Sequence, residues 1–318
     1  MNDNSMAIII LCSHMCGGEN IRPLEPSEWT ILADKLMAKK MSPGDLMTFS
    51  DDDFKSLLEY DKDEIQRIKR LIDRSGSIAF EIEKYMNMGI GIVTRADKKY
   101  PKALKEKLWK NCPPLFYFIG DLDTANKKCV GFVGSRSVAE CDCEFAENAV
   151  SKINSHEYSV VSGGAKGIDT VASQMSISNG NLSIEYISDS LIRKTRQKDV
   201  ISAVRNKQLL ILSAAKPDAG FNVGSAMARN KYIYAHSETT IVVKSDYKKG
   251  GTWNGAVNGI KSNICPVLCW NNSGYKGNTE LIKMGAIPID ESWDGNIQNY
   301  KDNRDKKTNE SEQLTFFD

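Results

Sequence analysis

From residue 128 onward, short apolar runs alternate with stretches of helical spacing, and this alternation constrains the fold more than any other feature. The apolar runs recur roughly every 25–30 residues and are nearly continuous, as in strands buried on both faces. They cover residues 129–134, 158–164, 182–188, 209–214, 239–245 and 264–270. Helices are expected between them at 144–154, 168–177, 223–229 and 253–261. The pattern predicts an α/β fold, a Rossmann-like doubly wound and mostly parallel sheet, over residues 128–293.

The remaining sequence divides into three further parts. Residues 1–90 are expected to form a small helical domain, because apolar residues recur there at helical spacing. Residues 91–127, with several prolines and aromatics, are expected to be an ordered connector that leads into the sheet. Residues 294–318 are polar and lack apolar periodicity, so we expect them to be a disordered tail.

Composition narrows the class of protein further. The 318 residues include 42 Lys and Arg against 41 Asp and Glu, with 41% hydrophobic residues, which is typical of a globular protein. Near neutrality excludes a basic coat over the whole surface but not a local basic face. The apolar run at residues 7–12 is far shorter than the roughly 20 residues that span a bilayer, and it lacks the features of a signal peptide. We therefore expect a cytoplasmic protein with no membrane association.

The eight cysteines do not have the pattern of a metal site. Cys265 and Cys269 lie in a strand-like run, where residues four apart are separated by about 13 Å, too far to share an ion. Cys12 and Cys16 form the other pair with this spacing. We expect buried, reduced thiols, with no metal and no cofactor.

Four motifs with glycine, serine and basic residues are expected at the ends of strands. They comprise Gly134, Ser135 and Arg136; Ser162, Gly163, Gly164, Lys166, Gly167 and Asp169; Arg229, Asn230 and Lys231; and Lys248, Lys249, Gly250, Gly251 and Thr252. Glycine allows the backbone to approach an anion closely, and helix N-termini favour negative charge. Arginine and lysine add charged donors, and serine adds hydroxyl donors. These residues predict a phosphate-binding site.

The same motifs argue against several enzyme classes. Neither a Walker A loop nor a GxGxxG fingerprint occurs, and the three histidines lie outside the motifs. Asp169, a carboxylate among basic residues, is expected to cap a helix or hold Arg136 rather than act as a base. We therefore predict no catalytic residue.

Charge is unevenly distributed along the chain. Residues 190–249 contain 12 basic and 4 acidic residues, a local net charge of +8, which favours a phosphate backbone. Tyr232, Tyr234, Tyr247 and Trp253 lie in or beside this segment and are candidates for stacking on bases. The alternative is that these aromatic side chains pack in the core.

The order of these motifs resembles the DNA-processing protein A family (DprA, also called Smf). The Gly-Ser-Arg string, the run from Ser162 to Asp169 and Arg229-Asn230-Lys231 carry the resemblance, which covers about residues 90–290. It implies a single-stranded-DNA-binding protein that acts in recombination or in DNA uptake during transformation. It also implies a homodimer that loads a RecA-type recombinase.

The sequence departs from the family pattern at several points, which indicates a divergent branch. Thr170-Val171 replace the usual Ala-His, and Lys231 replaces an arginine. The alternative function is a nucleotide sensor, or an enzyme that cleaves the glycosidic bond of nucleoside monophosphates. The signature of those enzymes is only partly present, since Ala256 and Val257 stand where their glutamate is expected.

The last residues form a separate motif. Gln313, Leu314, Phe316 and Phe317 resemble the short peptide by which bacterial proteins dock on the DNA-polymerase sliding clamp. Apolar anchors on a flexible tail are suited to a preformed groove. The alternative is that this segment folds back on its own domain.

Overall fold

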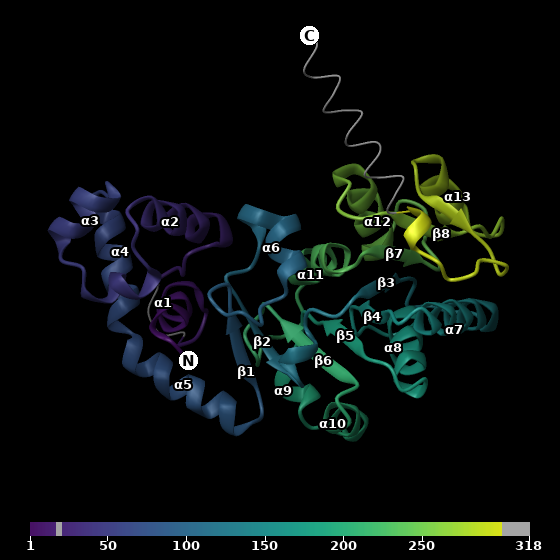
Figure 1. Cartoon of the computed structure of the whole chain (residues 1–318), viewed down its shortest axis with the longest axis horizontal. Helices are drawn as coiled ribbons and strands as arrows, with labels where there is room; N and C mark the ends of the chain where they lie inside the picture. Colours follow the sequence, from purple (N-terminus) through teal and green to yellow (C-terminus); the bar gives the residue numbers. More distant parts are fainter. Residues whose placement is uncertain (17–20, 301–318) are drawn as a thin grey trace, which may run out of the picture. The chain divides into compact units, whose positions relative to one another are not determined.

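The computed structural model describes residues 1–16 and 21–300, which form two compact units (Figure 1). The first, called here the helical unit, contains Met1–Asn126, Ser188–Ser202 and Leu212–Phe221. The second, called the sheet unit, contains Lys127–Ile187, Ala203–Ile211 and the described residues from Asn222 onward. Boundaries between the units fall inside α10 (Lys198–Arg205) and β6 (Leu209–Ser213).

The helical unit consists of short helices and one antiparallel strand pair. Its elements are α1 (Asp3–Cys12), α2 (Pro26–Ala38), η1 (Pro43–Thr48), α3 (Asp51–Leu58), α4 (Lys62–Asp73), α5 (Ser75–Asn87), β1 (Gly91–Thr94), α6 (Lys102–Leu108), η2 (Trp109–Asn111), β2 (Leu115–Ile119), η3 (Leu122–Thr124) and α9 (Leu191–Lys194). β1 and β2 pair antiparallel, from Gly91 opposite Phe118 to Thr94 opposite Leu115.

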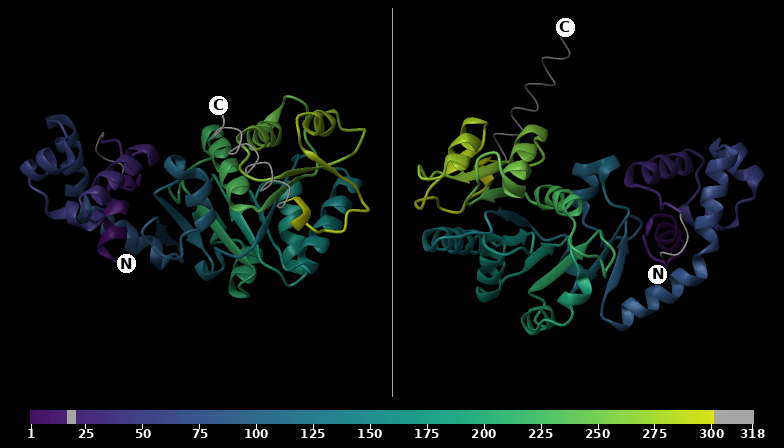
Figure 2. Two further views of the ribbon diagram at one scale, coloured as in Figure 1. Left: turned by 45° about the horizontal axis from the view of Figure 1, so that its top comes forward. Right: turned by 180° about the vertical axis from the view of Figure 1, so that it is seen from behind.

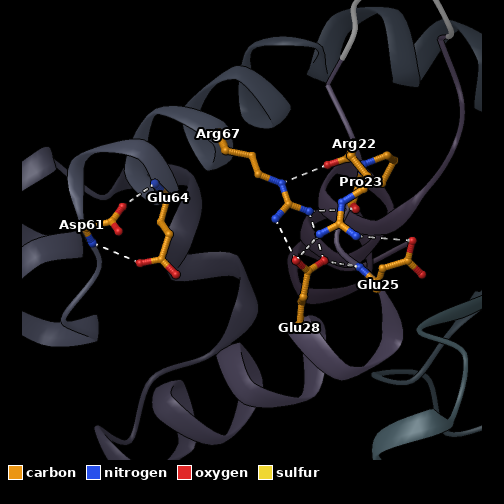
Figure 3. Close-up of polar contacts among 7 residues, drawn as sticks. All are labelled: Arg22, Pro23, Glu25, Glu28, Asp61, Glu64 and Arg67. Carbon is orange, nitrogen blue, oxygen red and sulfur yellow. Dashed lines mark hydrogen bonds and ion pairs between the residues drawn. The ribbon is translucent and has the colours of Figure 1, made fainter.

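Local sequence explains why α4 forms where it does. Asp61 caps the helix by accepting a hydrogen bond from the Glu64 backbone N–H (2.8 Å), while Glu64 accepts one from the Asp61 N–H (3.1 Å; Figure 3). Ile65, Ile68 and Leu71 recur at helical spacing and are buried. The helix therefore presents one apolar face to the core of its unit.

An arginine of α4 also fixes the chain that leads into α2. Arg67 donates to both carboxylate oxygens of Glu28, at 2.8 and 3.0 Å, and to the backbone carbonyls of Arg22 and Pro23 (Figure 3). Glu28 in turn accepts a hydrogen bond from the Glu25 N–H at 2.7 Å. The hydrogen bond from Arg67 is the main cause that lowers the pKa of Glu28, and partial burial opposes it.

The sheet unit is built on parallel strands whose order reverses in the middle. Its strands are β3 (Cys129–Val133), β4 (Ser159–Ser162), β5 (Ser183–Tyr186), β7 (Thr239–Val242), β8 (Val267–Trp270) and β9 (Ile287–Ile289), with the first residues of β6. The spatial order is β6-β5-β4-β3-β7-β8-β9. β3 pairs parallel with both β4 and β7, so the order reverses between β3 and β7. In such sheets ligands bind outside the carboxyl ends of strands at this point.

Helices cover both faces of this sheet. α7 (Glu140–Ser155) and α8 (Ile168–Ser178) cover one face, and α11 (Val223–His236) and α12 (Gly250–Ser262) cover the other (Figures 1 and 2). α13 (Lys276–Lys283) connects β8 to β9. The α7–α8 side holds a continuous core that includes Phe132, Phe145 and Leu268. The predicted doubly wound, mostly parallel sheet is confirmed.

Some features of the sheet unit were not expected from the sequence. β9, which α13 connects to β8, extends the sheet beyond the six predicted strands. Ile297, within the stretch expected to be a disordered tail, is 1% exposed in the core. Among the helices of residues 1–16 and 21–300, none is long and apolar enough to cross a membrane.

Candidate nucleic-acid interface

Three of the four predicted motifs lie in turns or at a helix start of the sheet unit, here called the strand-end loops, whereas Arg229, Asn230 and Lys231, also expected at a strand end, lie within α11. The strand-end loops comprise residues 134–136 after β3, 162–167 at the end of β4, 243–249 after β7, and 250–252 at the start of α12. Five basic side chains on or next to these loops are exposed, and we call them the exposed cations: Arg136, Lys166, Lys231, Lys248 and Lys249.

The turns after β3 and β4 pack closely against each other at two glycines. Gly167 has φ +84°, and a Cβ there would lie 2.3 Å from the carbonyl oxygen of Ser135. A Cβ on Gly134 would lie 2.4 Å from the Ile168 side chain. The Ile168 N–H donates to the Ser135 carbonyl at 3.3 Å. Only glycine fits both positions, so the first two motifs form one rigid structure.

A buried ion pair supports the turn after β4. Arg229 is 8% exposed, its Nη1 lies 3.5 Å from Asp169 Oδ2, and a Cβ on Gly163 would lie 1.2 Å from that nitrogen. Asp169 thus holds Arg229, whereas the sequence suggested Arg136 as its partner. Ser162, expected to offer its hydroxyl to a phosphate, is instead fully buried and donates that hydroxyl to the Asp169 carbonyl at 3.3 Å. Arg229 and Ser162 therefore stabilise the turn from within.

Burial also determines the acidity of Asp169. It raises the pKa of this carboxyl to about 6, although the Arg229 charge and a hydrogen bond from the Ala165 N–H oppose the shift. The nearby carboxylate of Glu185 adds to the rise. Asp169 therefore has a structural role, beneath the turn after β4.

The third and fourth motifs are tied to each other and to the first. Asn230 donates from Nδ2 to the Gly251 carbonyl at 3.1 Å. Thr252 donates from Oγ1 to the Gly134 carbonyl at 2.9 Å, which bridges the strand reversal between β3 and β7. The structure thus brings all four predicted motifs to the carboxyl edge of the sheet.

The predicted site residues do not include Asn278, which fixes the turn after β7. Asn278 is fully buried, accepts a hydrogen bond from the Ser245 N–H (2.8 Å), and donates to the carbonyls of Val243 and Trp270, both at 2.9 Å. A Cβ on its neighbour Gly277 would lie 1.9 Å from the Ser245 carbonyl oxygen. A Gly-Asn pair near the start of a helix was the available signal.

A second group missed from the sequence surrounds Asp142. This buried carboxylate accepts hydrogen bonds from the Ala139 N–H (2.7 Å), the Lys244 ammonium (2.8 Å) and the Tyr275 hydroxyl (2.5 Å). Burial alone would raise the pKa of Asp142, but these three donors together lower it. The positive charge of Lys244, just after β7, is therefore balanced by Asp142.

The basic segment at residues 190–249 is divided between the two units. Five of its cations belong to the helical unit: Arg193, Lys194, Arg196, Lys198 and Lys216. In the sheet unit, Arg229 and Lys244 are paired with aspartates. The count of +8 therefore overstates the charge that the sheet unit presents at the strand-end loops.

The four candidate aromatic residues differ in burial. Tyr234 is 2% exposed and packs against Gly259. Trp253 is also buried, and Tyr232 packs against Tyr186 with ring centroids 5.7 Å apart. Tyr247 is half-buried beside the exposed Lys248. The alternative that these rings pack in the core thus holds for Tyr234 and Trp253.

Two other predictions concern residues outside this edge. Within residues 1–16 and 21–300, no three or more His, Cys, Asp or Glu side chains gather as a metal site would require. Five of the eight cysteines are buried, and burial raises the pKa of Cys269 to about 12.

The predicted clamp-docking residues Gln313, Leu314, Phe316 and Phe317 lie outside the described residues.

Comparison with known proteins gives consistent results. A family model for DNA recombination-mediator protein A matches residues 91–299, more than half of the chain. The DNA processing protein DprA of Streptococcus pneumoniae is 29% identical over 178 residues, 54% of this chain. The match spans 58% of the length of that relative.

Two solved structures share the fold. The X-ray structure of DprA from Streptococcus pneumoniae superposes with a TM-score of 0.62 at 19% identity, covering 84% of this chain and 95% of that one. DprA from Helicobacter pylori, described by its single-stranded DNA binding mode, gives a TM-score of 0.53 at 22% identity, covering 69% and 96%. On the evidence of the family model, this chain belongs to the DNA recombination-mediator protein A family.

Proposed function

We propose that this protein binds single-stranded DNA at the strand-end loops and acts as a recombination mediator. The observation that carries the proposal is the set of exposed cations around two interlocked glycine turns, at the reversal of strand order. Backbone N–H groups at such turns and cationic side chains both favour phosphate oxygens. The family description and the DNA-binding relative from Helicobacter pylori support this function.

The chemistry favours a single strand over a duplex. Arg136 and Lys166 are exposed on two turns that Gly134 and Gly167 allow to pack closely against each other. A flexible strand adapts its phosphate spacing to such a compact site, and strands bound in this way show strong salt dependence. In this proposal, cationic side chains and backbone N–H groups bind the phosphates, so the affinity depends little on base identity.

The test compares the wild-type protein with the double variant Arg136→Ala, Lys166→Ala. Fluorescence anisotropy with a labelled dT20 strand at two salt concentrations is expected to show at least a tenfold loss of affinity. The slope of log K against log salt should fall by roughly 0.7 for each phosphate that the variant no longer binds. A duplex of the same length should bind more weakly to the wild type.

A matched control removes the same charges elsewhere. Lys62→Ala with Arg70→Ala changes one lysine and one arginine, both exposed on α4 of the helical unit. We expect this control to keep wild-type affinity and salt slope. If the Arg136, Lys166 double variant also keeps them, the strand-end loops are not the DNA site.

The mediator role adds partners to this proposal. We propose a cytoplasmic homodimer that loads a RecA-type recombinase on single strands, in recombination or in DNA uptake. The test is the rate of recombinase ATP hydrolysis on a strand precoated with single-strand-binding protein, which this protein should increase. Light scattering coupled to gel filtration measures the dimer, and a monomer at working concentration would exclude it.

The proposed function is binding rather than catalysis. The signature of nucleoside-monophosphate hydrolases has a glutamate where this chain has Ala256 and Val257, on the helix that begins at Gly250. Incubation with nucleoside monophosphates should therefore release no free base. Base release at catalytic rates would favour the nucleotide-processing alternative.

The clamp-docking motif remains a prediction of its own. Deletion of residues 313–318 should abolish binding to the sliding clamp and leave affinity for dT20 unchanged. If the intact protein does not bind the clamp, the motif has no such role.

A further inference from the structure

Two lysines from distant parts of the sequence lie over the ring of Tyr247, in the turn after β7. The Lys248 ammonium is 5.1 Å from the centre of the ring, and the Lys276 ammonium is 4.8 Å from it. The two nitrogens are therefore no farther apart than the sum of these distances. Both lysines are exposed, and Tyr247 is half-buried.

The ring of Tyr247 packs against a buried tryptophan. The indole of Trp253 meets Tyr247 edge to face, with ring centroids 5.1 Å apart and an interplanar angle of 83°. Trp253 is buried and follows Thr252, whose hydroxyl donates to the Gly134 carbonyl at 2.9 Å. This chain of contacts connects Tyr247 to the turn after β3, within the proposed DNA site.

Lys276 is brought to the ring by two of its neighbours. Gly277 lets the start of α13 approach the turn so closely that a Cβ would lie 1.9 Å from the Ser245 carbonyl oxygen and 3.0 Å from the Tyr247 nitrogen. Asn278 then fixes this approach by accepting a hydrogen bond from the Ser245 N–H at 2.8 Å. The juxtaposition of Lys248 and Lys276 thus rests on buried contacts.

The charges around this cluster leave a positive surface. Asp142 is paired with Lys244, and Glu280 is paired with Lys283, each at 2.8 Å. Lys248 and Lys276 add to the lowering of the pKa of Glu280, after the hydrogen bond from Lys283. Asp246 and Lys249 are exposed beside them in the turn.

From this geometry we infer that Lys248, Lys276 and Tyr247 form a second phosphate-binding subsite for the same single strand. The tyrosine ring orients the two ammonium groups by cation–π attraction, so less side-chain entropy is lost when they grip the phosphodiester backbone. The subsite extends the path of the strand from the turns after β3 and β4 toward α13. This inference rests on the proposed function, since it requires that the wild-type protein bind single-stranded DNA.

The experiment measures binding of labelled dT20 by anisotropy at two salt concentrations for the wild type and four variants. Lys276→Ala should weaken binding about fivefold to tenfold and reduce the salt slope by roughly 0.7, the value for one phosphate contact. Tyr247→Phe keeps the aromatic face and should bind like the wild type, whereas Tyr247→Leu should weaken binding. Lys261→Ala, an exposed lysine in the last turn of α12, is the matched control and should change neither quantity.

The outcomes separate this inference from the proposed function. If Lys276→Ala keeps wild-type affinity and salt slope while Arg136→Ala with Lys166→Ala loses them, the subsite is excluded and the main site stands. If Tyr247→Leu binds like Tyr247→Phe while Lys276→Ala is weakened, the orienting role of the ring is excluded. If the wild type does not bind dT20, the proposed function and the subsite both fail.

Discussion

The helical unit and the strand-end loops of the sheet unit use basic residues in opposite ways. In the helical unit, two arginines donate to backbone carbonyls. Arg67 donates to those of Arg22 and Pro23 (Figure 3), and Arg74 donates to that of Ile10 near the end of α1. At the strand-end loops, the turns are held by glycine, asparagine and threonine. Four basic side chains there, Arg136, Lys166, Lys248 and Lys249, are exposed, whereas Lys244 is paired with a buried carboxylate, that of Asp142.

The difference follows from the backbone groups that each architecture leaves unpaired. A short helix ends in carbonyls without intrahelical partners, and a small helical domain has many such ends. A guanidinium group satisfies several of them at once. Turns between parallel strands and helices are closed by small residues instead. Charge counts alone therefore do not locate a binding surface, because they do not distinguish structural cations from exposed ones.

The largest expected effect is on the interlocked turns. Gly167→Ala places a Cβ against the Ser135 carbonyl at a backbone conformation that favours glycine, φ +84° and ψ −135°. We expect the free energy of unfolding to fall by about 4 kcal/mol, with loss of DNA affinity in the folded fraction. Urea denaturation and dT20 binding measure the two effects.

Gly180→Ala is the matched control for that substitution. Gly180 has φ +77° but no heavy atom within 4 Å of an added Cβ. We expect a loss of about 1 kcal/mol and unchanged DNA affinity. Equal losses for the two variants would show that the contact between the turns contributes nothing.

The next effect tests whether cations of the helical unit are structural. Arg74 donates to the carbonyls of Ile10 (2.5 Å), Ser13 (2.9 Å) and Met15 (3.3 Å). Arg74→Met should lower the free energy of unfolding by about 3 kcal/mol, because these carbonyls lose their donor. The exposed Arg70, one turn earlier, is the control, and Arg70→Met should change it by less than about 0.5 kcal/mol. A loss of DNA affinity in folded Arg74→Met would contradict the comparison.

A smaller effect concerns the pH dependence of the sheet unit. The folded-state pKa of Asp169 is raised to about 6, so the folded state holds its proton more tightly than the unfolded state. Its contribution to stability therefore falls as pH rises from about 4 to about 6, by roughly 2–3 kcal/mol in total. Asp169→Asn should lack this slope, so the difference in free energy of unfolding between wild type and variant should change by that amount, measured by denaturation from pH 4 to pH 7.

Asp142 has the opposite dependence and a different pH range. Its pKa is lowered, so its contribution to stability is present above about pH 4 and is lost at lower pH. Asp142→Asn should therefore leave the slope between pH 4 and pH 6 unchanged. If Asp169→Asn also leaves that slope unchanged, burial does not raise the pKa of Asp169 in the folded protein.

The smallest effect tests an exposed cation of the sheet unit. Lys231→Ala should weaken dT20 binding about fivefold, equal to about 1 kcal/mol, and leave the free energy of unfolding unchanged. Anisotropy and thermal denaturation give the two values. If Lys231→Ala changes the free energy of unfolding but not the affinity for dT20, Lys231 is a structural cation instead.

Much of the fold could be predicted because it depends on local pattern. The six apolar runs each contain a strand, and the helices expected between them at 144–154, 168–177, 223–229 and 253–261 are α7, α8, α11 and α12. The positions of the motifs after β3, β4 and β7 follow directly from those strands. By contrast, β9 has only three residues, which is too short for a clear apolar signal.

The roles of individual site residues could not be predicted in the same way. Arg229 and Lys231 are two residues apart in the sequence, yet one is buried against Asp169 and the other is exposed. They differ because they project from different faces of α11, and only one of those faces meets the turn after β4. Asn278 and Lys276 reach the turn after β7 through the close approach of α13 to it, which depends on Gly277.

The sequence by itself determined the alternation of strands and helices and placed glycine-rich basic motifs at strand ends, because hydrophobic periodicity and turn chemistry are local properties. The tertiary structure alone decided which strands are neighbours, that β3 lies between β4 and β7, and which cations are buried with aspartates. It also brought Lys276 to Tyr247 across the sequence. These features depend on contacts between distant segments, whose distances and burial are fixed only when the chain has packed.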